Sequence, residues 1–160
     1  MTPAFTASSR TVARLGTEIV IPATATQVWA VLADTRRYPE WNPFIRTLSG
    51  RLVAGEHVSA TIQPIGQRAM TFRPLILRAD EGRELRWRGR FLHRGIFQGE
   101  HAFRLLPEAS PTRLVHEETF SGLMLRFMDV ESFRPSFEAM NEALKARVAR
   151  ISTLTEKENS

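Results

Sequence analysis

The stretch Phe133–Leu154, FRPSFEAMNEALKARVARISTL, decides the fold of this 160-residue chain. Its apolar residues recur at steps of three and four positions, which is the spacing of one face of an amphipathic helix. These residues are Phe133, Phe137, Met140, Leu144, Val148 and Ile151. Charged side chains fill the other faces. The pattern therefore predicts one long C-terminal helix with a single buried face, and a sheet is needed to cover that face.

Upstream of this helix, apolar and polar residues alternate in the manner of β-strands. Six such segments follow one another: Ile45–Val53, Val58–Ile65, Ala69–Ala79, Glu84–Phe91, Ile96–Leu106 and Thr112–Phe120. Short turns with Gly or Pro separate them, which predicts an antiparallel meander. Pro64 and Pro74 interrupt two of the segments, so we expect bulges or bends there.

The N-terminal part supplies a seventh strand and two short helices. Arg14–Ile21 alternates as a strand, and Thr24 or Thr26 can cap a helix that follows it. Two prolines in Arg36–Phe44 (RRYPEWNPF) stop that helix and predict a compact helical turn. The expected fold class is α+β: a curved seven-stranded antiparallel sheet wrapped around a long C-terminal helix, with two short helices after the first strand.

Composition limits the classes of protein that need to be considered. We expect one domain over residues 12–155, a disordered N-terminal tail over 1–11 and a C-terminal tail over 156–160. The chain has no cysteine, which excludes disulfides, a thiol nucleophile and a thiolate metal site. No segment reaches the roughly 18 apolar residues of a membrane span, and no signal peptide is recognisable. We therefore expect a cytoplasmic protein without a membrane span, with the oligomeric state left open between monomer and dimer.

Arginine dominates the positive charge of the chain. The formal net charge is +5, and all but two of the 22 basic residues are arginine. The densest run is Arg83, Arg86, Arg88, Arg90 and Arg94. In one interpretation this run is an ordinary solvated sheet face, with Arg88 paired to Glu100 across a hairpin. The alternative is an interaction module that uses this face to bind a macromolecule or an anionic membrane. No aromatic–basic recognition pattern accompanies the run, which disfavours nucleic acid as a partner.

Strand alternation also predicts which side chains face inward and meet each other. With a turn centred on Arg94 and a short loop over 108–111, the opposite pairs are Trp87–His101, Gly89–Gly99, His101–Glu118 and Phe103–His116. An aromatic inner wall with one histidine–carboxylate group in its middle is expected. A carboxylate in an apolar pocket must pair or have its pKa raised. The two inward glycines either leave room for a ligand or permit curvature of the sheet, and both interpretations remain open.

These patterns yield a set of candidate ligand-binding residues. They are Phe72, Trp87, Gly89, Phe97, Gly99, His101, Phe103, His116, Glu118, Phe120, Phe137 and Met140. Within this set, His101 and Glu118 are candidates for general acid–base catalysis, or alternatively for polar anchoring of a ligand. His116-Glu117-Glu118 superficially resembles a zinc motif, but position 120 is Phe, so no metal is expected. No phosphate-binding loop or nucleophile elbow is present, and no cofactor is expected.

The order of elements and the local sequence together resemble the SRPBCC (START-like, birch-pollen-allergen-like) superfamily, and in particular its polyketide cyclase/dehydrase and lipid-transport branch. The stretches that carry the resemblance are Ile19–Ile45, Glu84–Phe91, Phe97–Leu105, Val115–Leu123 and Phe137–Val148. The resemblance implies a helix-grip fold with a cavity between the sheet and the long helix.

Function follows from this resemblance only in outline, because members bind lipids, quinones, hormones or polyketides and only some are catalysts. The expected function is binding, with possible roles in transport or sequestration, of a small hydrophobic ligand that is lipid-like or aromatic and polycyclic. Whether the protein is an enzyme is left open. The enzyme alternative is a cyclase or dehydratase in which His101 and Glu118 act as acid and base, without a metal or covalent nucleophile.

Overall fold

The computed structural model describes residues 4–8, 11–91, 96–107 and 111–158. Six antiparallel strands form the main sheet in the order β1-β2-β9-β8-β7-β6, and three form a small sheet in the order β3-β4-β5. The main sheet contains β1 (Ala4–Ser8), β2 (Val12–Ile21), β6 (Leu75–Asp80), β7 (Glu84–Phe91), β8 (Phe97–Pro107) and β9 (Thr112–Ser121). The small sheet contains β3 (Ile45–Ser49), β4 (Ser59–Ile62) and β5 (Met70–Phe72).

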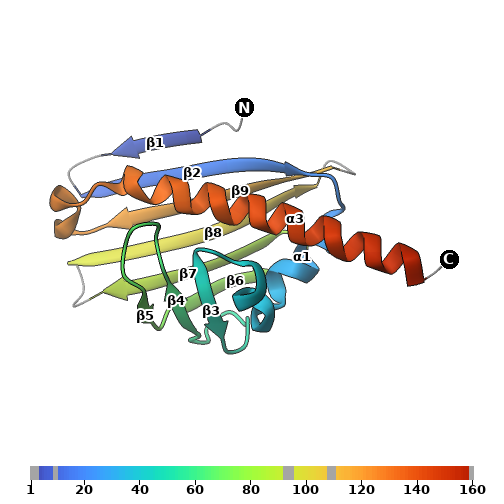
Figure 1. Ribbon diagram of the computed structural model, residues 1–160. Coiled ribbons are helices and arrows are strands. Elements are labelled where there is room, and N and C mark those ends of the chain that lie inside the picture. Colours follow the sequence, from blue (N-terminus) through green and yellow to red (C-terminus); the bar gives the residue numbers. More distant parts are fainter. Residues whose placement is uncertain (1–3, 9–10, 92–95, 108–110, 159–160) are drawn as a thin grey trace.

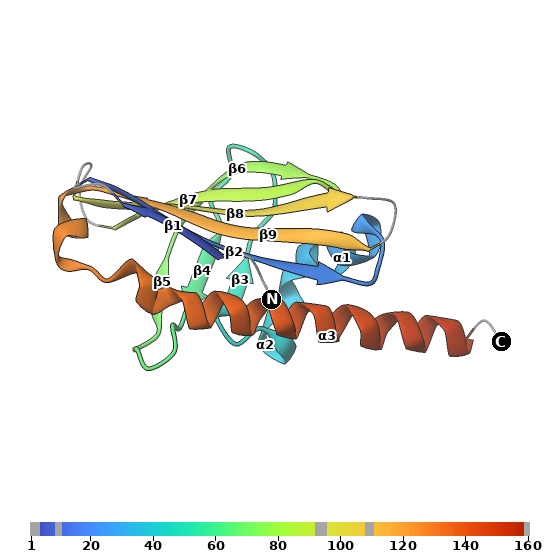
Figure 2. The same cartoon turned by 90° about the horizontal axis from the view of Figure 1, so that it is seen from above.

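The helices cover one face of the main sheet. They are α1 (Ala25–Ala33), η1 (Thr35–Arg37), α2 (Tyr38–Trp41), η2 (Leu123–Phe127), η3 (Val130–Phe133) and α3 (Arg134–Glu158). The long α3 lies across the sheet (Figure 1), and the small sheet stands between the main sheet and α3 (Figure 2). This arrangement confirms the predicted α+β class, with a curved antiparallel sheet around a long C-terminal helix.

The apolar stripe of α3 is buried as the sequence predicted, except at its C-terminal end. Phe137, Met140 and Leu144 are at most 1% exposed, whereas Ile151 is 39% exposed. The difference arises because α3 runs past the end of the sheet (Figure 2). The helix also continues to Glu158, into the segment predicted as a C-terminal tail.

Two strand assignments differ from the predicted ones. The single strand predicted over Ala69–Ala79 is two strands, separated at Pro74. The first, β5, pairs with β4 in the small sheet, and the second, β6, pairs with β7 in the main sheet. Pro74 has no backbone N–H to donate to a ladder, so the chain can leave one sheet and join the other there. At the N-terminus, β1 pairs with β2, so the prediction of a disordered tail did not anticipate this strand. An added strand satisfies backbone groups that would otherwise be unpaired along the edge of β2.

The predicted cross-strand register is confirmed. Trp87 lies opposite His101, and His101 in turn lies opposite Glu118. Gly89 and Gly99 are also partners, as are Phe103 and His116. The predicted turn residues 92–95 and the loop residues 108–110 lie outside the described part of the chain.

Two arginines of the predicted run, Arg86 and Arg88, form a mixed-charge network on the outer face of this sheet, whereas Arg94 lies outside the described residues. Arg88 pairs with Glu100 at 3.1 Å, as predicted, and Arg86 contacts Glu84 at 2.6 Å and Glu100 at 2.8 Å. These carboxylates offset much of the positive charge, which favours the interpretation of a solvated sheet face. Within the part of the chain that the structure covers, no helix has the length and apolar character needed to cross a bilayer.

Candidate functional site

An apolar cavity of about 220 Å³ lies in the interior between the two sheets and the turns that precede α3. From the main sheet it is lined by Trp87, Gly89, Phe97, Gly99, His101, Glu118 and Phe120. The remaining wall comprises Phe44, Ile45, Ile62, Gln67, Met70, Phe72, Met128 and Phe133. Apart from Gln67, His101 and Glu118, this lining is apolar.

Most of the predicted ligand-binding residues line this cavity, but four do not. Phe103, His116, Phe137 and Met140 are buried beyond the cavity wall, where the His116 ring stacks on Phe137 with centroids 4.1 Å apart. They belong to the packed core beneath the site.

Apart from Phe72, sequence reasoning missed the wall contributed by the small sheet and by the turns before α3. Alternation within β4 and β5 was visible in the sequence. Their approach to the main sheet depends on the crossing at Pro74, which was predicted only as a bend. Phe133 was recognised as the first residue of the helical stripe, yet its place at the cavity follows from the turn of η3.

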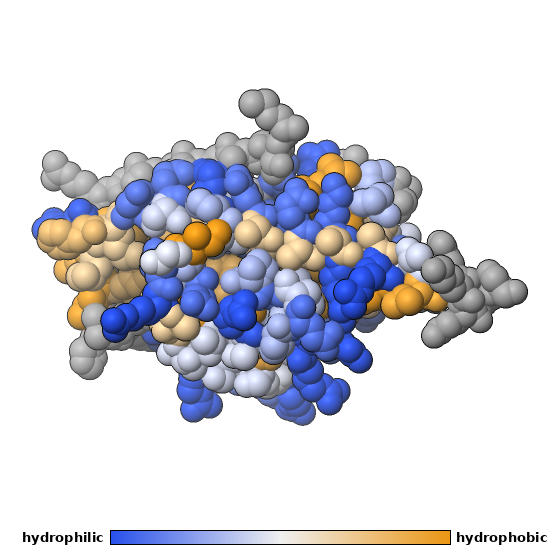
Figure 3. All heavy atoms as spheres, in the orientation of Figure 1, coloured by the Kyte–Doolittle hydropathy of each residue, from blue (hydrophilic) through white to orange (hydrophobic). Residues whose placement is uncertain are grey.

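The cavity reaches the molecular surface beside the β4–β5 hairpin. Met70 lines the cavity and is also 39% exposed. Met128, which also lines the cavity, follows η2, in which Leu123 and Phe127 are largely exposed. Figure 3 shows apolar surface at the end of the molecule where Figure 1 places the turns after β9. A hydrophobic molecule would therefore meet apolar surface at this opening.

A buried histidine–carboxylate pair forms the polar part of the cavity wall. His101 Nδ1 lies 3.1 Å from Glu118 Oε2, and the His101 side chain is 5% exposed. The Trp87 indole stacks on the His101 ring at 5.1 Å with an interplanar angle of 7°. A Cβ atom added at Gly99 would collide with Glu118 Oε1. The space left by this glycine is therefore occupied by the Glu118 carboxylate. The sequence had suggested either room for a ligand or curvature of the sheet, and at Gly99 the room holds a side chain of the site itself.

Behind this pair a hydrogen-bonded chain runs through three further side chains. His101 Nε2 lies 2.8 Å from His116 Nε2, and His116 Nδ1 lies 2.8 Å from Asn141 Oδ1. Asn141 Nδ2 then donates to Thr17 Oγ1 at 2.8 Å. β2, β8, β9 and α3 each contribute to the chain. Asn141 and Thr17 are fully buried and were not predicted as part of the site.

The acceptors in this chain fix the direction of its hydrogen bonds. Asn141 Oδ1 can only accept, so His116 Nδ1 carries the hydrogen. Burial, reinforced by the adjacent His101, holds the pKa of His116 well below its usual 6.5, while hydrogen bonds to Asn141 and to the Phe137 backbone act in the opposite direction. His116 is therefore neutral and its Nε2 accepts, which requires that His101 Nε2 donates. His101 Nδ1 and Glu118 are left to share one proton.

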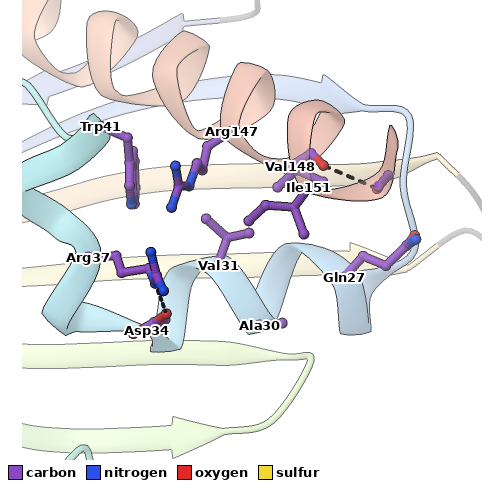
Figure 4. Close-up of a pocket in the computed structure, with 10 residues that line it drawn as sticks. Gln27, Ala30, Val31, Asp34, Arg37, Trp41, Arg147, Val148 and Ile151 are labelled. Atoms are coloured by element: carbon purple, nitrogen blue, oxygen red, sulfur yellow. Dashed lines mark hydrogen bonds and ion pairs between the residues drawn. The ribbon is translucent and has the colours of Figure 1, made fainter. Parts of the chain in front are cut away.

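A larger hollow of about 440 Å³ lies under the C-terminal end of α3, against α1 and α2 (Figure 4). The charged residues that line it are paired: Arg37 with Asp34 at 3.4 Å and with Glu40 at 3.1 Å, and Arg147 with Glu40 at 2.7 Å. Trp41 also lines the groove, and its buried Nε1 has no hydrogen-bond partner among the described residues. The groove therefore offers a neutral donor to a ligand, whereas the inner cavity contains the histidine–carboxylate pair. Across the described ranges, no three metal-ligating side chains converge. The candidate site is therefore the inner cavity.

A curved sheet and one long helix around an apolar cavity with a buried polar pair define a helix-grip protein with an internal ligand-type cavity. The family model described as "Polyketide cyclase / dehydrase and lipid transport" matches residues 12–149, and the chain belongs to this family. No curated protein matches the sequence.

Solved structures with the same fold come from plants and bacteria. A Rhodobacter sphaeroides protein is similar with 16% identity and a TM-score of 0.71, over 93% of this chain and 99% of that chain. Ginseng major latex-like protein 151 from Panax ginseng has 15% identity and a TM-score of 0.69, over 85% and 97% of the two chains. A norcoclaurine synthase mutant from Thalictrum flavum, in complex with a transition-state analogue, has 12% identity and a TM-score of 0.66, over 91% and 99%. At these identities the similarity establishes the fold.

Proposed function

We propose that the inner cavity binds a small hydrophobic molecule whose polar group faces the His101–Glu118 pair. The observation that carries this proposal is an apolar cavity with one buried polar pair in its wall. Few convergent polar groups in a mostly apolar pocket are typical of small-molecule sites. Membership of a family of cyclases, dehydrases and lipid-transport proteins supports the same function.

The size of the cavity narrows the ligand class. Its volume of about 220 Å³ lies below the range of about 300–1,000 Å³ found for drug-sized ligands. A ligand of one or two rings suits this volume better than the polycyclic or long-chain molecule considered from the sequence. Naphthalene is therefore a suitable apolar probe.

A thermal-shift titration with naphthalene, followed by calorimetry, tests the proposal. Wild-type protein is expected to show saturable binding and a raised melting temperature, because a ligand that binds only the folded state stabilises it. Gly89→Leu and Ile62→Phe fill the cavity from opposite walls and should each abolish the shift. Val20→Leu, on a side chain that is 51% exposed, is the matched control and should leave it unchanged. Equal binding by the wild type and both filled variants would refute the proposal.

A second candidate function is acid–base catalysis of the cyclase or dehydratase type. It is favoured by the shared proton between His101 and Glu118, because a carboxylic acid or imidazole in an apolar cavity is a suitable proton donor and acceptor. Norcoclaurine synthase supplies an example of an enzyme with this fold. For a substrate that is turned over, His101→Ala and Glu118→Gln should abolish turnover, while naphthalene, which makes no hydrogen bond to the pair, should still bind. Unchanged turnover in both variants would exclude this role for the pair.

A further inference from the structure

We infer that the cavity selects neutral ligands bearing a hydroxyl group, of the phenol or enol class, over carboxylates and amines of the same shape. The inference rests on the proposed function and adds the chemical class of the ligand. The selecting group is the Glu118–His101 pair. His116, Asn141 and Thr17 act as positioning residues, because they fix the direction of the hydrogen bonds that reach this pair.

The hydrogen-bonded chain ends inside the protein. Thr17 Oγ1 accepts from Asn141 and donates to the backbone carbonyl of His116 at 3.5 Å, so the last side chain turns back onto β9. His116 and Asn141 are at most 2% exposed, and Thr17 is fully buried. The chain therefore holds His101 in one tautomer and does not carry protons to solvent.

His101 donates its Nε2 hydrogen to His116, so its Nδ1 is the nitrogen that remains to interact with Glu118. The pair then carries a single proton, located either on Glu118 Oε or on His101 Nδ1, and its net charge is zero in both arrangements. A pair without net charge offers no electrostatic gain to an anion or a cation that must leave water to enter an apolar cavity.

Glu118 Oε1 is the atom of the pair that is available to a ligand. Oε2 is bound to His101, whereas Oε1 lies over Gly99, which lines the cavity. The shared proton stays between Oε2 and His101 Nδ1, so Oε1 accepts a hydrogen bond in both arrangements. A hydroxyl group can donate to this oxygen without carrying a net charge.

The other cavity residues provide no counter-ion for a charged ligand. Among the described residues that line the cavity there is neither lysine nor arginine, and the polar side chain besides the pair is the neutral Gln67. A carboxylate would meet a Glu118 oxygen without a proton to donate. An ammonium group could donate to Oε1, but its positive charge would leave water to enter an apolar cavity beside a pair without net charge.

Calorimetric titration with naphthalene, 2-naphthol, 2-naphthoate and 2-naphthylmethylamine at neutral pH tests the inference with one ring system. We expect 2-naphthol to bind about tenfold more tightly than naphthalene, which corresponds to one net hydrogen bond of about 1.4 kcal/mol. The naphthoate and the amine should bind more weakly than 2-naphthol. Equal affinities of 2-naphthol and naphthalene, or tightest binding of either ion, would overturn this inference and leave the proposed binding function intact. Absence of binding by all four probes would overturn the proposed function itself.

The positioning role has a readout that does not depend on any ligand. Ring ¹⁵N chemical shifts should show the hydrogen of His116 on Nδ1 and that His101 Nε2 is protonated. Asn141→Leu removes the acceptor at similar volume and should erase the preference for 2-naphthol over naphthalene while naphthalene still binds. Thr17→Val tests the same chain if Asn141→Leu does not fold, and Glu142→Gln on α3 is the control. A His116 hydrogen on Nε2, or an unchanged preference in Asn141→Leu and Thr17→Val, would contradict the assigned chain.

Discussion

His116 is the residue whose charge state determines what His101 can donate. It is completely buried, and burial keeps its pKa well below 6.5 in the folded protein. In the unfolded chain the same imidazole titrates near its ordinary value. The unfolded state therefore binds more protons as the pH falls below that value, and folding stability must decrease there.

We expect the free energy of unfolding to fall by up to about 1.4 kcal/mol for each pH unit below about pH 6.5 on account of His116. Urea unfolding of the wild type and of His116→Gln between about pH 7 and pH 5 measures this slope. The variant should be less stable at pH 7 but should lose less on acidification. His57→Gln, at an exposed position, should retain the wild-type slope. Identical slopes for wild type and His116→Gln would show that His116 is not held neutral.

Gly99 gives a second prediction for single residues. Gly99→Ala places a methyl group against the Glu118 carboxylate, and overpacking of this kind destabilises a protein by about 1–3 kcal/mol. In a Glu118→Ala background the collision is absent, so the same substitution should be nearly neutral. A double-mutant cycle by urea unfolding measures this coupling. An equal effect of Gly99→Ala in both backgrounds would mean that the glycine is needed for backbone conformation alone.

Among the elements, α1 begins with a capping box. The sequence alone did not decide whether Thr24 or Thr26 is the N-cap residue, and the structure shows that it is Thr24. Thr24 Oγ1 accepts from the Gln27 backbone N–H at 3.3 Å, and the Gln27 side chain accepts from the Thr24 backbone N–H at 2.9 Å. Thr24→Ala should reduce the free energy of unfolding by about 1 kcal/mol. Thr26→Ala, inside the helix and exposed, should have little effect. Thermal or urea denaturation distinguishes them, and a larger loss for Thr26→Ala would contradict the assigned cap.

The outer face of the main sheet provides a prediction about its strands. Arg86 links Glu84 on its own strand with Glu100 on β8, and its side chain is 30% exposed. Arg86→Leu should lower stability by up to about 1 kcal/mol, less at high salt because exposed charges are screened. Arg90→Leu, at an exposed position of the same strand, is the comparison. Equal effects of the two substitutions in urea unfolding at low salt would argue against a stabilising network.

Local pattern sufficed to predict the elements and the register that bring His101, Glu118 and Trp87 together. Alternation has a period of two, so an approximate turn position already determines which residues face each other. The pattern did not predict how β3–β5 separate from the main sheet, because the change of sheet at Pro74 depends on contacts between segments far apart in the sequence. Asn141 was overlooked for the same reason. This single polar residue next to Met140 has hydrogen-bond partners, Thr17 on β2 and His116 on β9, only when α3 lies against these strands.

For the molecule as a whole, the main question is whether the inner cavity or the groove under the end of α3 accepts a ligand. The groove under the end of α3 is the larger, at about 440 Å³ against about 220 Å³ for the inner cavity (Figure 4). Its charges are paired with each other, whereas the inner cavity contains a polar pair with an oxygen over Gly99. Chemistry therefore favours the smaller hollow.

The most direct test of this central claim is NMR observation of intermolecular contacts between bound 2-naphthol and labelled methyl groups. Ile62, Met70 and Met128 report on the inner cavity, and Val31, Val148 and Ile151 report on the groove under α3. We expect saturable contacts between the naphthol ring and the first set, and no such contacts with the second. Contacts confined to the groove residues, or no saturable contacts with either set, would contradict the account.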